Sequence, residues 1–121
     1  MQGEGIFIQP DKSRYEGAFH NNKIEGAGMF EWIDGNTYDG SWKNNKMDGE
    51  GIYTWKDGRV YEGGYVNGKK QGFGVYKWTD GRVFEGEWYD GKQHGKGSYT
   101  DSKGVCREGE WREGQRIKWL E

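Results

Sequence analysis

Five carboxylates are the side chains of this sequence with the clearest capacity for chemistry, because they recur at one constant interval. Each lies 23 residues after the one before it: Glu16, Asp39, Glu62, Glu85 and Glu108. Carboxylates that converge can hold a divalent cation or divide the roles of general acid and general base. Whether these five converge depends on the distance between neighbours, which the secondary structure sets.

The remaining reactive side chains are scattered. His20 and His94 fall at different offsets in the 23-residue interval, so we interpret each as a surface histidine. Cys106 has no partner for an intramolecular disulfide and shares its offset with two valines, which favours a small strand residue over a nucleophile. Gly95-Lys96-Gly97-Ser98 looks like the end of a phosphate-binding loop, but Asp90 stands where the first glycine of that motif belongs.

Four lysines also recur at the same interval, and such a row could attract anionic lipid headgroups at about 1 kcal/mol per lysine. They are Lys23, Lys46, Lys69 and Lys92. Glu25 and Asp48 flank the first two, so solvated turn lysines are the favoured interpretation. Binding of phospholipids, including phosphoinositides, is therefore an alternative function rather than the main one.

Composition limits the fold and the partners. The chain has 121 residues, enough for one domain, and its 18 Lys and Arg nearly balance 20 Asp and Glu, so nothing indicates a nucleic-acid partner. Aliphatic residues are too few for an ordinary core, so 8 Tyr, 7 Trp and 5 Phe must supply the burial. The absence of a signal-like or spanning apolar segment and the single cysteine predict a cytoplasmic protein.

A repeat organises the whole chain. Gly-x-Gly begins at residues 3, 26, 49, 72 and 95, which predicts one array, residues 1–121, of five 23-residue copies. Seventeen of the twenty aromatic residues lie in four columns with the same period. One column contains tryptophan only in the central copies, at Trp32, Trp55 and Trp78, because Gln9 and Asp101 take its end positions.

Two loops per copy would bring all the aromatic rings to one face. A three-residue loop, Lys56-Asp57-Gly58, with glycine in the left-handed position, pairs Trp55 with Arg59 and Tyr53 with Tyr61. A two-residue loop at Asn67-Gly68 then pairs Tyr65 with Lys70, Gly63 with Gly72 and Tyr61 with Gly74. Each aromatic ring would lie over bare glycine backbone.

The predicted fold class is therefore all-β: an elongated, single-layer, twisted antiparallel sheet of five hairpin repeats. Equivalent residues in neighbouring copies are two strands apart, about 9 to 10 Å, which is too far for the carboxylates to share a metal or a proton. We expect no catalytic residue, no metal and no cofactor, and hence no enzyme activity within the array.

The stretch from Tyr61-Glu62-Gly63 to Gly74-Val75-Tyr76 resembles the MORN repeat, the membrane occupation and recognition nexus motif. The resemblance covers nearly the whole chain and implies elongated hairpin arrays with non-catalytic roles. Those roles are protein scaffolding, end-to-end homodimerisation, phospholipid binding and attachment to membranes, the cytoskeleton or cilia. Some members carry a separate catalytic domain such as a lipid kinase, so the array could also be the regulatory region of a larger enzyme.

An aromatic trough of this kind predicts that a partner helix or extended peptide binds along it. The expected contact residues are Trp32, Trp55, Trp78, Tyr38, Tyr61, Phe84, Trp42, Tyr65 and Trp88.

The array departs from its own pattern at both ends. Lys12 takes the place of the glycine of Asp-Gly in copy one, and Lys118 and Leu120 stand where Gly-x-Gly was due. Residues 115–121 are therefore predicted to form a cap, with an apolar Trp119-Leu120 docking edge as the alternative. The two free edges of such a sheet also predict a homodimer or short polymer formed through an array end.

Overall fold

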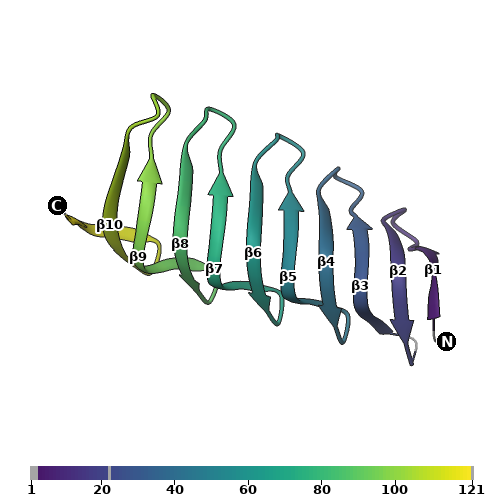
Figure 1. Ribbon diagram of the computed structural model, residues 1–121. Helices are drawn as coiled ribbons and strands as arrows, with labels where there is room; N and C mark the ends of the chain where they lie inside the picture. The colour runs from purple at the N-terminus through teal and green to yellow at the C-terminus, as the bar shows by residue number, and fades with distance from the viewer. Residues whose placement is uncertain (1–2, 22, 121) are drawn as a thin grey trace.

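The computed structural model describes residues 3–21 and 23–120, and all regular structure in them is β-strand. The strands form one open antiparallel sheet in which each strand pairs with the next along the chain (Figure 1). Their bounds are β1 Gly3–Ile8, β2 Arg14–His20, β3 Lys23–Glu31, β4 Thr37–Lys43, β5 Lys46–Thr54, β6 Val60–Val66, β7 Lys69–Lys77, β8 Val83–Tyr89, β9 Lys92–Thr100, β10 Cys106–Arg112 and β11 Gln115–Leu120. The predicted elongated single-layer sheet of hairpins is confirmed.

The three-residue loops lie along one edge of the sheet and have the predicted geometry. In copy three the Trp55 N–H donates to the Arg59 carbonyl at 2.9 Å, and the Gly58 N–H donates to the Trp55 carbonyl at 3.0 Å. Gly58 has φ +102°, a value that a residue with a Cβ rarely adopts. Tyr53 consequently faces Tyr61, as expected.

The two-residue turns lie along the opposite edge, and here part of the predicted pairing is wrong. Asn67 and Gly68 have φ +51° and +82°, and Tyr65 faces Lys70 as predicted. Beyond that pair the register shifts by two residues, so that Gly63 faces Gly74 instead of Gly72, and Tyr61 faces Tyr76 instead of Gly74.

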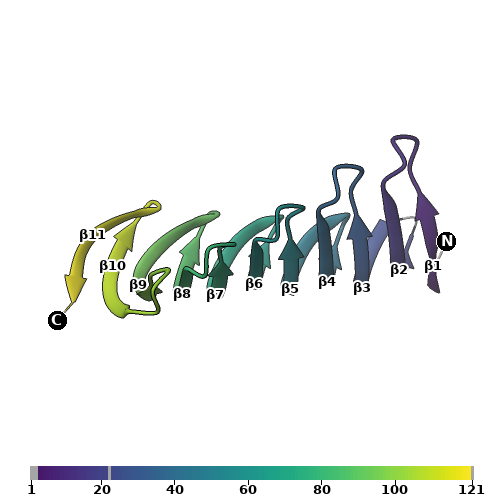
Figure 2. The same cartoon turned by 90° about the horizontal axis from the view of Figure 1, so that it is seen from above.

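A β-bulge on the longer strand causes the shift. Gly72, at φ +85°, lies in the bulge of β7, and the same interruption recurs in β3, β5 and β9. A shift of two residues keeps every side chain on its original face, so strand alternation alone cannot detect it. The bulge also bends the strands, as Figure 2 shows most clearly for β9 to β11.

The core consists of aromatic rings on one face of this single layer. Tyr15, Tyr38, Tyr61 and Phe84 are 0% exposed although no second layer covers them. Such burial requires the sheet to bend toward its aromatic face, which is therefore the concave one. Each ring lies against glycine: a Cβ added at Gly74 would overlap the ring and hydroxyl of Tyr61.

The tyrosine hydroxyls compensate for the bulges. Tyr38 Oη donates to the Ser41 carbonyl at 3.1 Å and Tyr61 Oη donates to the Gly64 carbonyl at 3.1 Å. Ser41 and Gly64 are the residues that the register shift leaves without a facing partner on the bulged neighbouring strands β5 and β7. A bulge interrupts the ladder of backbone hydrogen bonds, so the ring that fills the bend also binds a carbonyl there.

The C-terminal strand closes the aromatic row. β11 shifts its register by one residue, which places Trp119 opposite Gly109. The half-buried Trp119 ring lies 6.2 Å from those of Trp111 and Tyr99. Trp119 therefore packs on the last copy of the array, while the cap and the docking edge both stay predictions; residue 121 lies outside the described residues.

Candidate protein-binding face

The outer layer of the concave face is a row of partly exposed aromatic rings, which we call the aromatic trough. It consists of Trp32, Tyr53, Trp55, Trp78 and Tyr99, all half-buried, together with the buried Phe30 at its start and the buried Tyr76 between Trp55 and Trp78. Neighbouring centroids are 4.6 to 5.4 Å apart from Phe30 to Trp78, and 6.3 Å apart from Trp78 to Tyr99. The row is unbroken across copies two to five.

The structure separates the predicted contact residues into two layers. Trp32, Trp55 and Trp78 lie in the aromatic trough and keep exposed ring surface. The others lie beneath, in the core, with exposed fractions between 0% and 8%: Tyr38, Tyr61, Phe84, Trp42, Tyr65 and Trp88. These six rings cover glycine backbone and one another, so they offer little surface to a partner, and their direct contact with one stays a prediction.

Hydrogen bonds from the residues that directly follow the three-residue loops hold the trough in place. Asn36 Nδ2 donates to Tyr53 Oη at 3.1 Å, and one copy later Arg59 donates from its guanidinium to Tyr76 Oη at 3.0 Å. Asn36 Oδ1 also accepts the Lys56 N–H at 2.9 Å. Because Asn36 and Arg59 each bind a ring of the following copy, the rings are held in fixed positions.

Three cations lie among these rings, and sequence reasoning missed them as a group. The guanidinium carbons of Arg59 and Arg82 lie 5.0 Å from the ring centroids of Trp55 and Trp78. Lys70 Nζ lies 5.4 Å from the centroids of Trp55 and Tyr61 and 5.7 Å from that of Trp88. The predicted pairing of Tyr65 with Lys70 already placed that lysine on the aromatic face and could have revealed it.

Burial dominates the electrostatics beneath the trough. It raises the pKa of Tyr38 to about 12 and also raises the pKa values of Tyr61 and Tyr65, so these phenols remain neutral in the folded protein. Burial lowers the pKa of Lys70, and the positive charge of Arg59 lowers it further. The protein thus carries a partly desolvated ammonium in the middle of an aromatic surface.

A hollow of about 500 Å³ opens at the N-terminal end of the same face. Its walls include Phe7, Phe19, Phe30, Trp32 and Gln9. Gln9 occupies the column that holds Trp32, Trp55 and Trp78 in the next copies, so the space exists where an indole is missing. Phe7 remains 50% exposed at its rim.

The family model for the MORN repeat matches residues 15–37, 38–58, 61–81, 84–106 and 108–116. The chain belongs to the MORN repeat family. MORN repeats occur in protein-interaction and membrane-binding contexts, and the family is generally non-catalytic. No curated protein matches the chain.

The predicted lysine row of this MORN array lies along the edge that carries the two-residue turns. Lys23, Lys46, Lys69 and Lys92 are all exposed. Lys69 Nζ forms an ion pair with Asp90 at 3.0 Å, so the edge alternates charges instead of presenting a continuous basic strip.

The repeated carboxylates of the MORN array lie on the convex face, away from the trough. Asp39 faces Met29 on one side and Ile52 on the other, and Ser98 lies between Glu85 and Glu108, so another residue separates successive acids. Within residues 3–21 and 23–120, no three acidic, histidine or cysteine side chains gather as a metal site would require. No helix in this described part could span a membrane. Cys106 is exposed and His94 lies beside Tyr89.

Proposed function

We propose that this MORN array is a non-catalytic interaction module that binds a helix or an extended segment of a partner protein along the aromatic trough. The observation that carries the proposal is the unbroken row of half-buried rings around Trp32, Trp55 and Trp78 on a face that no other element of the described chain covers. Tryptophan and tyrosine dominate binding energies because they bury large areas at a small cost in side-chain entropy.

The dimensions of the trough suit such a segment. Strands about 4.8 Å apart give the whole array a length of about 50 Å and the three central copies about 29 Å. An α-helix of about 20 residues spans about 30 Å. The hydrogen bonds from Asn36 and Arg59 fix the rings before any partner arrives, which reduces the entropy lost on binding.

The test compares two double variants. Partners are captured from the native cell, identified by mass spectrometry, purified and titrated against the wild-type array. Replacing Trp55 and Trp78 by Ala should lower the affinity for the purified partner at least about 10-fold, since truncating a hot-spot residue costs about 2 kcal/mol or more of binding free energy. Replacing Lys46 and Lys69 by Ala is the control and should change the affinity little. Equal losses in both variants, or no loss from the tryptophan pair, would contradict the proposal.

Phospholipid binding is the second candidate function, and the exposed lysine row favours it. Flotation with vesicles containing phosphoinositides, at low salt, tests it. The array should float with the vesicles, and replacing Lys23, Lys46, Lys69 and Lys92 by Gln should abolish flotation. Failure of the wild-type array to float removes this candidate and leaves protein binding untouched.

The cellular setting belongs to the same proposal: a cytoplasmic module that tethers its partner at the cytoskeleton, a cilium or a membrane. The array would serve equally well as the regulatory region of a larger enzyme such as a lipid kinase. The mass of the native gene product and imaging of a tagged protein distinguish these settings.

A further inference from the structure

Lys70 is a charged group without a counter-charge. Its ammonium lies between the rings of Trp55, Tyr61 and Trp88, and among the described residues no carboxylate or other hydrogen-bond acceptor pairs with it. The charged group that influences it most is Arg59, which is also positive. A partly desolvated cation beside a second cation favours an anion brought by a ligand.

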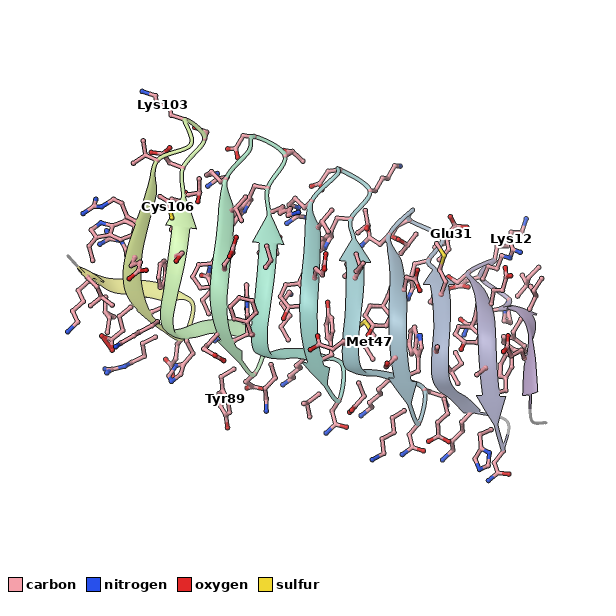
Figure 3. The ribbon with its side chains drawn as sticks, viewed as in Figure 1. Lys12, Glu31, Met47, Tyr89, Lys103 and Cys106 are labelled. Atoms are coloured by element: carbon pink, nitrogen blue, oxygen red, sulfur yellow. The ribbon has the colours of Figure 1, made fainter. Side chains whose placement is uncertain are left out.

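The hairpin itself does not require a lysine at this position. The equivalent residues in the other copies are Ile24, Met47, Gln93 and Arg116, each facing the aromatic residue that corresponds to Tyr65. Met47, one copy earlier, lies close to the two-residue turn (Figure 3). Side chains that differ this much all fit this position of the hairpin, so the fold does not require an ammonium there.

Further cations line the same side of the sheet. Arg82 lies over Trp78 in copy four, and Arg107 and Arg116 lie 4.3 and 4.4 Å from the ring centroid of Trp119. In the central copies, Arg59 and Arg82 form ion pairs with Asp57 and Asp80 at 2.9 and 2.8 Å. Both ion pairs are exposed, and exposed ion pairs contribute little to stability, so they exchange readily for a ligand carboxylate.

The convex face carries the opposite charge. Its central row alternates acids with apolar residues, including Asp39, Ile52 and Glu62, and Ile52 is 41% exposed. An acidic ligand is therefore repelled from the convex face and attracted to the trough, where Lys70, Arg59 and Arg82 lie among apolar rings.

Building on the proposed function, we propose that the segment bound in the trough is an acidic amphipathic helix of a partner protein. Its apolar side chains lie on Trp55 and Trp78, with one bulky side chain in the hollow between Phe7 and Trp32. Its carboxylates pair with Lys70, Arg59 and Arg82. The bulky residue thus lies over copies one and two, and the carboxylates lie over copies three and four.

The experiment uses three synthetic helical peptides of about 20 residues, the length that spans the central copies. All carry the same stripe of Leu with one terminal Trp, and their remaining positions are rich in Glu, Gln or Lys. Affinities for the full chain are measured by fluorescence anisotropy of a dye on each peptide. The Glu peptide should bind about 10-fold more tightly than the Gln peptide, as expected for one charge-assisted hydrogen bond, and the Lys peptide most weakly.

The repeat itself supplies matched variants. Lys70→Gln, Arg59→Asn and Arg82→Asn introduce residue types that the chain already carries at Gln93 and Asn36, and Asn36 shows that asparagine can bind the neighbouring tyrosine hydroxyl. This triple variant should lose the preference for Glu over Gln. The control replaces three edge lysines by Gln and removes the same charge: Lys46, Lys69 and Lys92. It should keep the preference, and thermal melting of both variants confirms that they are folded.

The outcomes separate this inference from the proposed function. Equal binding of the Glu and Gln peptides, or equal loss of preference in both triple variants, overturns the acidic partner. Absence of binding by all three peptides overturns it as well. If the Glu and Gln peptides bind equally well, the trough is still the binding face provided that the double variant Trp55→Ala, Trp78→Ala binds neither of them. Peptide binding that is indifferent to the tryptophan pair counts against the proposed function itself.

Discussion

At the scale of single residues, stability depends on glycines that leave room for rings. Residues 5, 28, 51, 74 and 97 form one column, and the last four each lie under a tyrosine or phenylalanine ring. Gly5, at the start of the array, has only Phe19 Cε2 nearby, at 3.8 Å from a Cβ built on it. One column therefore contains both covered glycines and an open one.

Gly74→Ala should destabilise the protein by about 1 to 3 kcal/mol, because the added methyl overlaps the Tyr61 ring and overpacking forces the ring and backbone apart. Gly5→Ala is the control and should change stability by less than about 0.5 kcal/mol, since it makes an ordinary contact. Urea unfolding followed by tryptophan fluorescence measures both. Similar effects of the two substitutions would mean that ring-over-glycine packing does not set the stability.

The buried phenols predict loss of stability at high pH. Folding raises the pKa values of Tyr38, Tyr61 and Tyr65 above the usual 10, so the folded state favours the neutral phenol. This contribution is complete below pH about 10 and is lost as pH rises through the folded pKa values. The free energy of unfolding, measured in urea from pH 8 to 11.5, should therefore fall at the alkaline end.

Two variants separate the contributions to this pH dependence. Tyr61→Phe introduces the residue type found at Phe84 and should make the alkaline fall shallower, while losing the bond to the Gly64 carbonyl costs about 0.5 to 1.5 kcal/mol at pH 7. Lys70→Gln removes a group of opposite sign, because its lowered pKa makes stability rise with pH near its own titration. An unchanged alkaline slope in Tyr61→Phe would exclude the phenol as the cause.

At the scale of the strand and hairpin, the sequence predicts the period, the loops and the shared aromatic face. Trp55 facing Arg59 follows from Asp57-Gly58 and from strand parity, two local signals. The bulge at Gly72 does not follow, because both registers keep Tyr61 and Gly74 on the concave face. Only three-dimensional packing distinguishes them: the bend lets Tyr61 cover Gly74 and bind the Gly64 carbonyl. The division of the predicted contact residues into an exposed trough and a buried core depends on the same bend, so the sequence could not predict that division either.

Copy one has Gln9 where the central copies have a tryptophan, and this difference allows a test of whether the hollow is an unfilled ring position. Gln9→Trp should fill the hollow and pack on Phe7 and Phe30, as Trp32 packs on Phe30 and Tyr53 in the next copy. We expect a gain of about 0.5 to 1.5 kcal/mol in the free energy of unfolding, the value of an added aromatic pair. Ile8→Trp, one residue away on the convex face, is the control. A gain no larger than that of the control would show that the hollow is not an unfilled ring position.

At the scale of the whole molecule, the array has two ends that differ in their packing. In the described part of the chain, β1 and β11 each pair on one side only, and the two ends lie far apart (Figure 1). At the C-terminal end Trp119 packs on Trp111 and β11 exposes Ile117 at 47%, whereas β1 exposes three apolar side chains, Ile6, Phe7 and Ile8, at 59%, 50% and 64%. An edge strand with exposed apolar side chains and unpaired backbone groups invites pairing with another chain.

We therefore expect this chain to associate through β1. Whether a dimer or a polymer forms depends on which strand of the second copy pairs with β1. Pairing of β1 with β1 of another copy joins two arrays and stops there, because a two-fold interface uses up the edge. Pairing of β1 with β11 leaves free edges at both ends and continues into a polymer. Sedimentation velocity over increasing protein concentration distinguishes these products, since the first reaches a plateau at the dimer and the second does not.

Charged substitutions identify the edge responsible. Ile6→Lys with Ile8→Lys should keep the chain monomeric at every concentration, because lysines on an edge strand oppose pairing. Ile52→Lys is the matched control: it lies in the column of Ile6, is 41% exposed, and sits in the interior strand β5, which already pairs on both sides. It should associate as the wild type does. A wild-type chain that stays monomeric throughout would contradict association by β1, and association that survives the edge lysines would assign it to another surface.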